Sequence, residues 1–170
     1  MEQLKMVRGN ENTAEIILPE GYYMRSYQKG DGIGWCECCI GGSLGLDEIS
    51  EAEFERKMLR DNNINPDNIF FLISPSGEIA GTVTYQYSHE QDTGTIHMVG
   101  IKKDYLGKRL ALPMILYAVK MMLEDGKKII NLTTDDWRLP AIKTYLRAGF
   151  KPVYHKPDME GRWSKIMELA

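Results

Sequence analysis

The sequence predicts an α/β or α+β fold in which helices pack on a mixed β-sheet. Residues 69–101 (IFFLISPSGEIAGTVTYQYSHEQDTGTIHMVGI) contain three apolar or alternating runs, separated by the turn-forming clusters Ser74–Gly77 and Glu90–Gly94. This pattern is typical of a β-meander. After residue 101 the hydrophobic pattern changes to that of a helix, which is followed by one more strand and a second helix. A strand-helix-strand order favours a parallel strand pair, so we expect strands in both directions.

Length and composition indicate a single domain over residues 1–170. Apolar residues make up 43% of the chain, which is enough for a normal core. The 21 basic and 24 acidic residues are interspersed and give a net charge of -3, so we expect no nucleic-acid partner. Residues 1–12 lack a secretion signal, and no run of about 18 apolar residues is present. We therefore expect a cytoplasmic protein without a membrane partner.

The first third of the chain predicts short strands and two helices. Ala14–Gln28 has strand-like apolar residues broken at Pro19, which indicates two short strands or a strand and a lead-in. A helix is expected around Gly34–Ile40. Another is expected over Ser50–Asp61, because Ser50 is a good N-cap and Glu53 follows three residues later.

The third run of the meander, TIHMVGI, is expected to alternate between two faces of the sheet. A period of two residues places His97, Val99 and Ile101 on one face. The same period places Ile96 and Met98 on the other.

The rest of the chain predicts two helices around a strand. The first helix covers Leu110–Leu123 and ends near Gly126. The apolar residues of Lys127–Asp135 indicate a strand that is buried on both faces. The second helix starts at Pro140, a favoured first residue, and stops at Gly149, a favoured C-cap.

The three cysteines lie together in WCECC, as Cys36, Cys38 and Cys39. No second group of Cys or His residues follows at the spacing of a zinc site. We expect thiols that are buried or half-exposed in a helical segment, and no metal.

The order of strand, charged turn and helix from residue 95 to residue 111 resembles the acyl-CoA-binding core of the GNAT acetyltransferase superfamily. Family members carry an alternating strand, a Q/R-x-x-G-x-G/A turn, a helix, a strand, and a helix with the pattern A-I-x-x-Y-x-x-x-G-F. Ala141–Phe150, AIKTYLRAGF, fits the last pattern without a gap. The resemblance implies a GNAT-like mixed central sheet of about six to seven strands flanked by helices.

The turn matches the family pattern in a variant form. Leu106 takes the Gln/Arg position, Arg109 takes the first required glycine, and Ala111 matches the final Gly/Ala. Gly107 and Lys108 match a common lead-in of the family. Arg109 therefore brings a Cβ where the backbone normally approaches the pyrophosphate most closely, and it also adds a cation.

The resemblance implies that this turn binds the pyrophosphate of acetyl-CoA, the acyl donor. Amides from Gly107 to Ala111, with that of Leu110 among them, would be unpaired at the helix start. Lys108 and Arg109 would assist. Pro113 indicates a late helix start or a kink in the first turn. In the alternative interpretation, the turn only exposes charge in a loop.

Four further residues have roles that the resemblance implies. In GNAT proteins the strand before the turn separates from its neighbour, and its free backbone groups, here near Val99 and Ile101, hold the pantetheine arm and polarise the thioester. Tyr145 takes the position of the usual general acid, although its helical face would also suit a packing residue. His97 stands where some members place a proton-relaying histidine, although it could serve structure alone.

Other polar residues stay open as candidates. Glu90, Asp92 and Thr95 are alternatives to His97 as the base. Arg138 replaces an asparagine that many relatives have three residues before the AI pair, and it could reach a phosphate, with Lys143 a weaker candidate. Both cations could equally be solvated.

Together these features predict an N-acetyltransferase that transfers the acetyl group from acetyl-CoA to a primary amine by direct attack in a ternary complex. The acceptor is a small-molecule amine or a protein N-terminus. It would be selected by Ile33–Asp61 and by a loop before the final strand, Tyr154–Trp163. The alternatives are a non-catalytic acyl-CoA-binding sensor and a structural module. A homodimer is common in the family.

Overall fold

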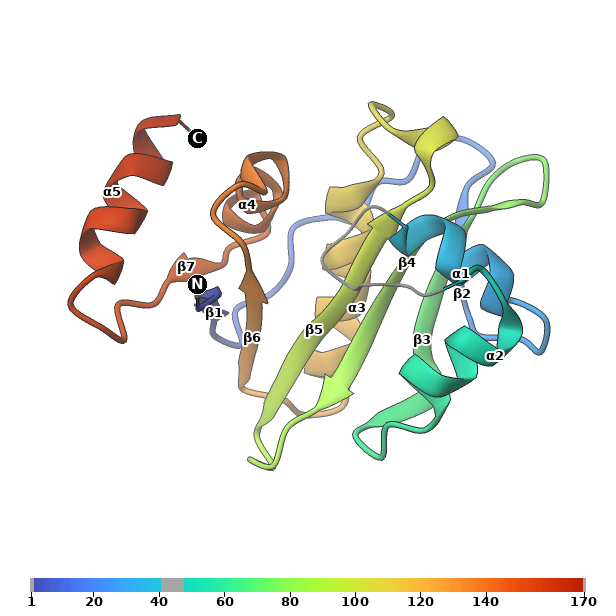
Figure 1. Cartoon of the computed structure of the whole chain (residues 1–170), viewed down its shortest axis with the longest axis horizontal. Helices are drawn as coiled ribbons and strands as arrows, with labels where there is room; N and C mark the ends of the chain where they lie inside the picture. Colours follow the sequence, from blue (N-terminus) through green and yellow to red (C-terminus); the bar gives the residue numbers. More distant parts are fainter. Residues whose placement is uncertain (1, 41–47, 170) are drawn as a thin grey trace.

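The computed structural model describes residues 2–40 and 48–169, and seven strands in this part of the chain form one sheet (Figure 1). The order across the sheet is β2-β3-β4-β5-β6-β1-β7. All neighbours are antiparallel except β5 and β6, which are parallel. The predicted mixed sheet of six to seven strands is confirmed. In chain order the strands are β1 (Leu4–Arg8), β2 (Tyr23–Ser26), β3 (Ile64–Ile73), β4 (Ile79–Tyr87), β5 (Thr93–Ile101), β6 (Ile129–Thr134) and β7 (Lys151–Pro152).

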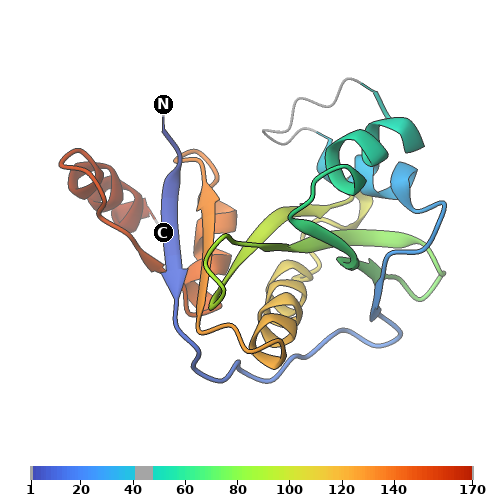
Figure 2. The same cartoon turned by 90° about the horizontal axis from the view of Figure 1, so that it is seen from below.

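Helices cover both sides of the antiparallel half of the sheet, as Figure 2 shows for α3 and the pair α1–α2. One apolar cluster joins α3, α4 and α5 to the sheet, and a second cluster lies under α1 and α2. No helix in the described ranges is long and apolar enough to cross a membrane. The helical segments are α1 (Gly32–Cys39), α2 (Glu51–Phe54) with the π-helical turn η1 (Glu55–Leu59), the 3-10 turn η2 (Lys103–Tyr105), α3 (Ala111–Glu124), α4 (Leu139–Arg147) and α5 (Met159–Leu169).

The predicted helix boundaries are confirmed where capping residues set them. The Ser50 hydroxyl accepts a hydrogen bond from the Glu53 amide at 3.1 Å, which begins α2. At the end of α4, Gly149 has φ of 89°, a conformation that favours glycine. Pro113 does not delay α3, which begins at Ala111, because it lies in the first turn, where its missing N–H has no helical partner to lose.

Of the two alternatives predicted for Ala14–Gln28, the structure confirms a single strand with a lead-in, because residues 14–18 form no strand and β2 follows them. Other predictions are corrected. β1, which was not predicted, occupies the slot between β6 and β7. The segment Tyr154–Trp163 does not precede a strand but leads into α5. β6 is buried on one face only, since Ile129 is 44% exposed.

The prediction of a regular alternation along β5 was also wrong. Thr82 pairs with Gly100 and Thr84 pairs with His97, so two residues, Met98 and Val99, lie opposite one residue of β4. This is a β-bulge, and Met98 takes a positive φ of 55° in it. The bulge shifts the alternation by one residue. As a result, Val99 and Ile101 share the α3 cluster with Ile96, while Met98 packs in the cluster under α1 and α2.

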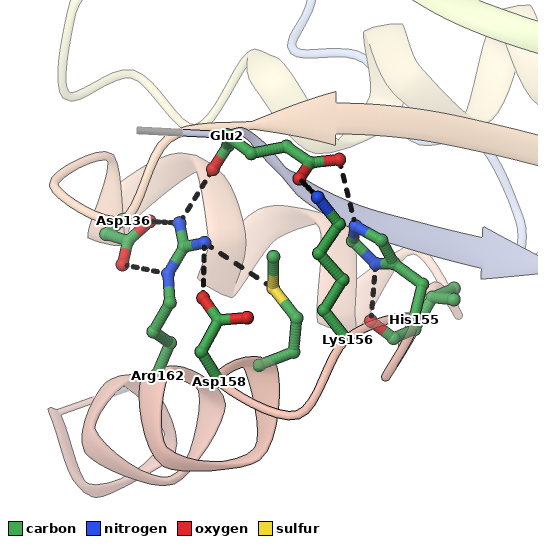
Figure 3. A network of polar contacts seen from close by, with 8 residues as sticks. Glu2, Asp136, His155, Lys156, Asp158 and Arg162 are labelled. Carbon is green, nitrogen blue, oxygen red and sulfur yellow. Dashed lines mark hydrogen bonds and ion pairs between the residues drawn. The ribbon is translucent and has the colours of Figure 1, made fainter.

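A network of polar contacts, which we call the terminal corner, ties the two ends of the chain to the loop between β6 and α4 (Figure 3). The Arg162 guanidinium on α5 donates two hydrogen bonds to Asp136 in this loop, the one from Nε measuring 3.0 Å. It also donates to the backbone oxygen of Glu2 at 2.9 Å. The Glu2 carboxylate in turn pairs with Lys156 and lies 3.4 Å from Nε2 of His155. The corner therefore fixes the loop that precedes α4.

Candidate active site

A cleft opens where β5 and β6 separate. The ladder between the two strands ends at the pair Thr95 and Asn131, and beyond it they diverge, as Figure 1 shows. The cleft has a volume of about 610 Å³. Its walls are residues 96–101 of β5, the end of β6, the β6–α4 loop with the start of α4, and residues 38–40 at the end of α1.

The separation leaves one edge of β5 without a strand partner at Val99 and Ile101, the two residues predicted from the sequence to hold the pantetheine arm. Val99 and Ile101 both line the cleft. The bulge at Met98 and Val99 turns the backbone further out of the regular ladder. Backbone N–H and C=O groups along such an edge are available to an extended ligand.

Tyr145 on α4 reaches the cleft from the side of the α3 cluster. It is 5% exposed and packs edge-on against Phe150, with ring centroids 6.2 Å apart. Burial raises the pKa of the Tyr145 phenol, while the nearby charge of Arg138 acts in the opposite direction. The phenol is therefore protonated at neutral pH and can act as a proton donor.

His97 lines the same cleft from β5, where it lies opposite Thr84. Burial lowers the pKa of His97 below its usual value of 6.5, and the charge of Asp61 partly offsets this. The imidazole is therefore neutral at pH 7 and able to accept a proton.

The three alternatives to His97 as the base have other contacts and do not line the cleft. The Thr95 hydroxyl donates to Asn131 at 2.7 Å. Glu90 accepts from the Thr93 hydroxyl at 3.1 Å, and Asp92 pairs with Lys128 at 2.9 Å.

The charged turn forms a smaller pocket of about 280 Å³ at the N-terminus of α3. Gly107, Arg109 and Ala111 line it, and so does Arg147 of α4. Arg109 has φ of 59°, in the left-handed region that favours glycine, which is the physical reason why a family pattern would carry glycine there. A helix start flanked by two guanidinium groups is suited to a phosphate.

The remaining predicted cofactor residues lie around the two pockets. Leu110 is buried at 2% exposure, so it can offer only its backbone. Lys108 does not line the small pocket, and its Nζ lies 5.1 Å from the centre of the Tyr105 ring. Arg138 lines the cleft, where its guanidinium lies 5.0 Å from the centre of the exposed Trp137 ring. Lys143 is exposed and lines neither pocket.

Several lining residues were not identified from the sequence. Gln3 and Thr134 come from regions without a motif, and Arg147 stands at a position of Ala141–Phe150 where the family pattern specifies no residue. Cys38 and Cys39 also line the cleft. α1 can approach β5 this closely because Gly100 has no side chain, and a Cβ there would lie 2.4 Å from the Cys38 carbonyl oxygen.

The cysteines fit the predicted buried thiols. All three are free, and burial raises the pKa of the Cys38 thiol to about 12. Among the described residues, no group of three or more His, Cys, Asp or Glu side chains is placed to hold a metal ion.

Comparison with known proteins gives relatives that are named as acetyltransferases. Mycothiol acetyltransferase of Pseudarthrobacter chlorophenolicus is 22% identical over 174 residues, which cover 98% of this chain and 52% of the relative. N-alpha-acetyltransferase MAK3 of Arabidopsis thaliana is 30% identical over 90 residues, which cover 50% of this chain and 47% of the relative. The chain thus spans about half the length of these curated relatives.

A solved structure has the same fold. The GCN5-related N-acetyltransferase from Sphaerobacter thermophilus superimposes with a TM-score of 0.69 at 22% identity, covering 89% of this chain and 48% of that chain. The model of the acetyltransferase (GNAT) family matches residues 34–150, which include the cleft walls of β5, β6 and α4. The chain therefore belongs to the acetyltransferase (GNAT) family.

Proposed function

We propose that this protein transfers an acetyl group from acetyl-CoA to a primary amine, and that the reaction takes place in the cleft between β5 and β6. The observation that carries the proposal is that the two pockets are neighbours, since Ile101 and Leu106 line both of them. A donor with a phosphate end and a long thioester arm suits this shape. Its phosphates would lie by Arg109 and Arg147, and its thioester between Tyr145 and His97.

The chemistry needs a proton acceptor and a proton donor on the two sides of the thioester. The neutral His97 takes the proton of the attacking amine, directly or through a water molecule. Backbone amides of β5 near Val99 stabilise the negative oxygen of the tetrahedral intermediate. When the C–S bond breaks, the protonated Tyr145 donates its proton to the sulfur, and free CoA leaves.

The proposal also covers the donor, the acceptor, the cellular location and the assembly of the protein. The family generally uses acetyl-CoA, and the acceptor here is a small-molecule amine or a protein N-terminus. We infer a cytoplasmic protein without nucleic-acid or membrane partners, and a homodimer is a further expectation.

Calorimetric titration with acetyl-CoA, with ATP and NAD as controls, tests donor binding. We expect saturable binding of acetyl-CoA alone. The absence of acetyl-CoA binding at millimolar ligand would contradict the proposal, because the strained Arg109 would then have closed the phosphate pocket.

Substitution of Tyr145 tests catalysis. We expect Tyr145→Phe to bind acetyl-CoA as the native chain does, and to release free thiol at least about 100-fold more slowly with an accepted amine. Tyr23→Phe is the matched control, because Tyr23 is 52% exposed on β2. Unchanged turnover would contradict the role of Tyr145 as the proton donor, whereas acetyl-CoA binding without thiol release in the native chain would support the rival view of a non-catalytic acyl-CoA sensor. Loss of both binding and turnover would indicate that Tyr145 serves packing.

A further inference from the structure

Thr134, the last residue of β6, has a hydroxyl group without a hydrogen-bond partner. The residue is 2% exposed, and its Oγ1 finds no partner among the described residues. Buried hydroxyl groups in folded proteins nearly always have a hydrogen-bond partner, so a buried hydroxyl without one needs an explanation. Thr134 also lines the cleft.

Two other buried threonines show why its position in the cleft matters. Thr82 is fully buried on β4, and its hydroxyl donates to the Phe70 carbonyl at 2.9 Å. Thr84 is also fully buried on β4 and, like Thr134, has an unpaired hydroxyl. Of the two unpaired hydroxyls, only that of Thr134 belongs to a residue that lines the cleft.

The strand register places Thr134 partway along the cleft. Thr95 of β5 is level with Asn131 of β6 in the parallel ladder. Thr134 lies three residues beyond Asn131, where this ladder has ended, and it lines the cleft together with Met98 and with Ile101, which lines both pockets. A donor whose phosphates lie at the small pocket and whose thioester lies by Tyr145 would run its pantetheine arm along this part of the cleft.

We propose that the Thr134 hydroxyl binds an amide group of the pantetheine arm of acetyl-CoA. A threonine hydroxyl can change direction by rotation about one bond, χ1, without movement of the backbone. The arm carries two amides, each with a donor and an acceptor, and Thr134 can serve either of them. This inference rests on the proposed function, and it assigns a binding residue that no family motif indicated.

Three isosteric variants test it: Thr134→Val, Thr84→Val and Thr82→Val. Removal of an unpaired buried hydroxyl is expected to leave the Tm unchanged or to raise it, and this applies to Thr134→Val and Thr84→Val. Thr82→Val is expected to lower the Tm, because it leaves the Phe70 carbonyl without its donor.

Ligand binding then separates Thr134 from Thr84. We expect Thr134→Val to bind acetyl-CoA about 3- to 10-fold more weakly than the native chain in calorimetry. Its affinity for adenosine 3′,5′-bisphosphate, which has no pantetheine arm, is expected to stay unchanged. Thr84→Val is expected to match the native chain with both ligands.

Two results would overturn the inference. Native acetyl-CoA affinity in Thr134→Val would mean that the hydroxyl is paired with water only. A lowered Tm with equal weakening of both ligands would mean that the hydroxyl supports the fold. If the native chain binds adenosine 3′,5′-bisphosphate but not acetyl-CoA, or binds neither, the proposed function itself fails and this inference fails with it.

Discussion

The terminal corner and the cleft share the β6–α4 loop, but they differ in how their polar groups are paired. In the corner, Arg162 contacts Asp136, Glu2, Asp158 and the sulfur of Met159. In the cleft, the Thr134 hydroxyl is unpaired, and the Arg138 guanidinium meets Asp135 only at 3.9 Å. Pairing within the chain marks groups that hold the fold, whereas an unpaired group of the cleft, such as the Thr134 hydroxyl, is one that we propose binds a ligand.

The largest effect on the free energy of unfolding is expected from a substitution in the terminal corner. Arg162→Met removes a guanidinium whose side chain is only 15% exposed and leaves Asp136 without its donor. We expect a loss of about 1–3 kcal/mol in the free energy of unfolding, measured by urea denaturation. Lys128→Met is the control, since its pair with Asp92 is 65% and 57% exposed and should matter little. An equal loss in both variants would remove the distinction between the corner and an ordinary surface pair.

A smaller effect, of opposite sign, is expected at the phosphate pocket. Arg109→Gly releases the backbone strain at φ of 59° and is expected to raise the free energy of unfolding by about 0.5–1 kcal/mol. The same change removes a cation and should weaken acetyl-CoA binding about tenfold. Arg109→Lys is the control, and it should keep both the strain and most of the affinity. If calorimetry finds native acetyl-CoA affinity in Arg109→Gly, the Arg109 side chain does not bind the phosphate.

The smallest effect is a pH dependence of the corner. The hydrogen bond from Arg162 lowers the pKa of Asp136 below its usual value of 3.8. A lowered pKa adds stability that is complete above the usual value and is lost as the pH falls through the folded-state value. Urea midpoints of the native chain should therefore fall more steeply than those of Arg162→Met from about pH 5 toward pH 2. Parallel curves would show that the pair adds nothing to acid stability.

The sequence predicted the parts of the fold that local rules determine. The Ser50 cap and the Gly149 stop depend on neighbouring residues, and the structure confirms both. It could not predict the bulge at Met98, because the register between two strands decides it. It also missed β1, whose short alternating pattern becomes a strand only through partners far along the chain.

The candidate site also contains residues that local sequence patterns identify and residues that only the packing of distant segments brings to the site. Tyr145 lies in a gap-free motif and His97 in a readable strand, and the structure brings both to one cleft. Thr134 lies in no motif, and Arg147 stands at a position of the Ala141–Phe150 motif that accepts any residue. They become candidates only when the separation of β5 and β6 and the packing of α4 place them at the pockets.

The position of β1 has a consequence for how the chain folds. The ladder between β1 and β6 pairs Leu4 with Thr134, and β1 also pairs with β7 through Met6 and Pro152. On the ribosome, β1 is made before β2, β3, β4 and β5, yet its partners β6 and β7 are made after them, so β1 must wait unpaired while those four strands are synthesised. Contacts of such long sequence separation slow folding. Since Gln3 lies beside this strand and lines the cleft, the complete cleft is among the last parts of the molecule to form.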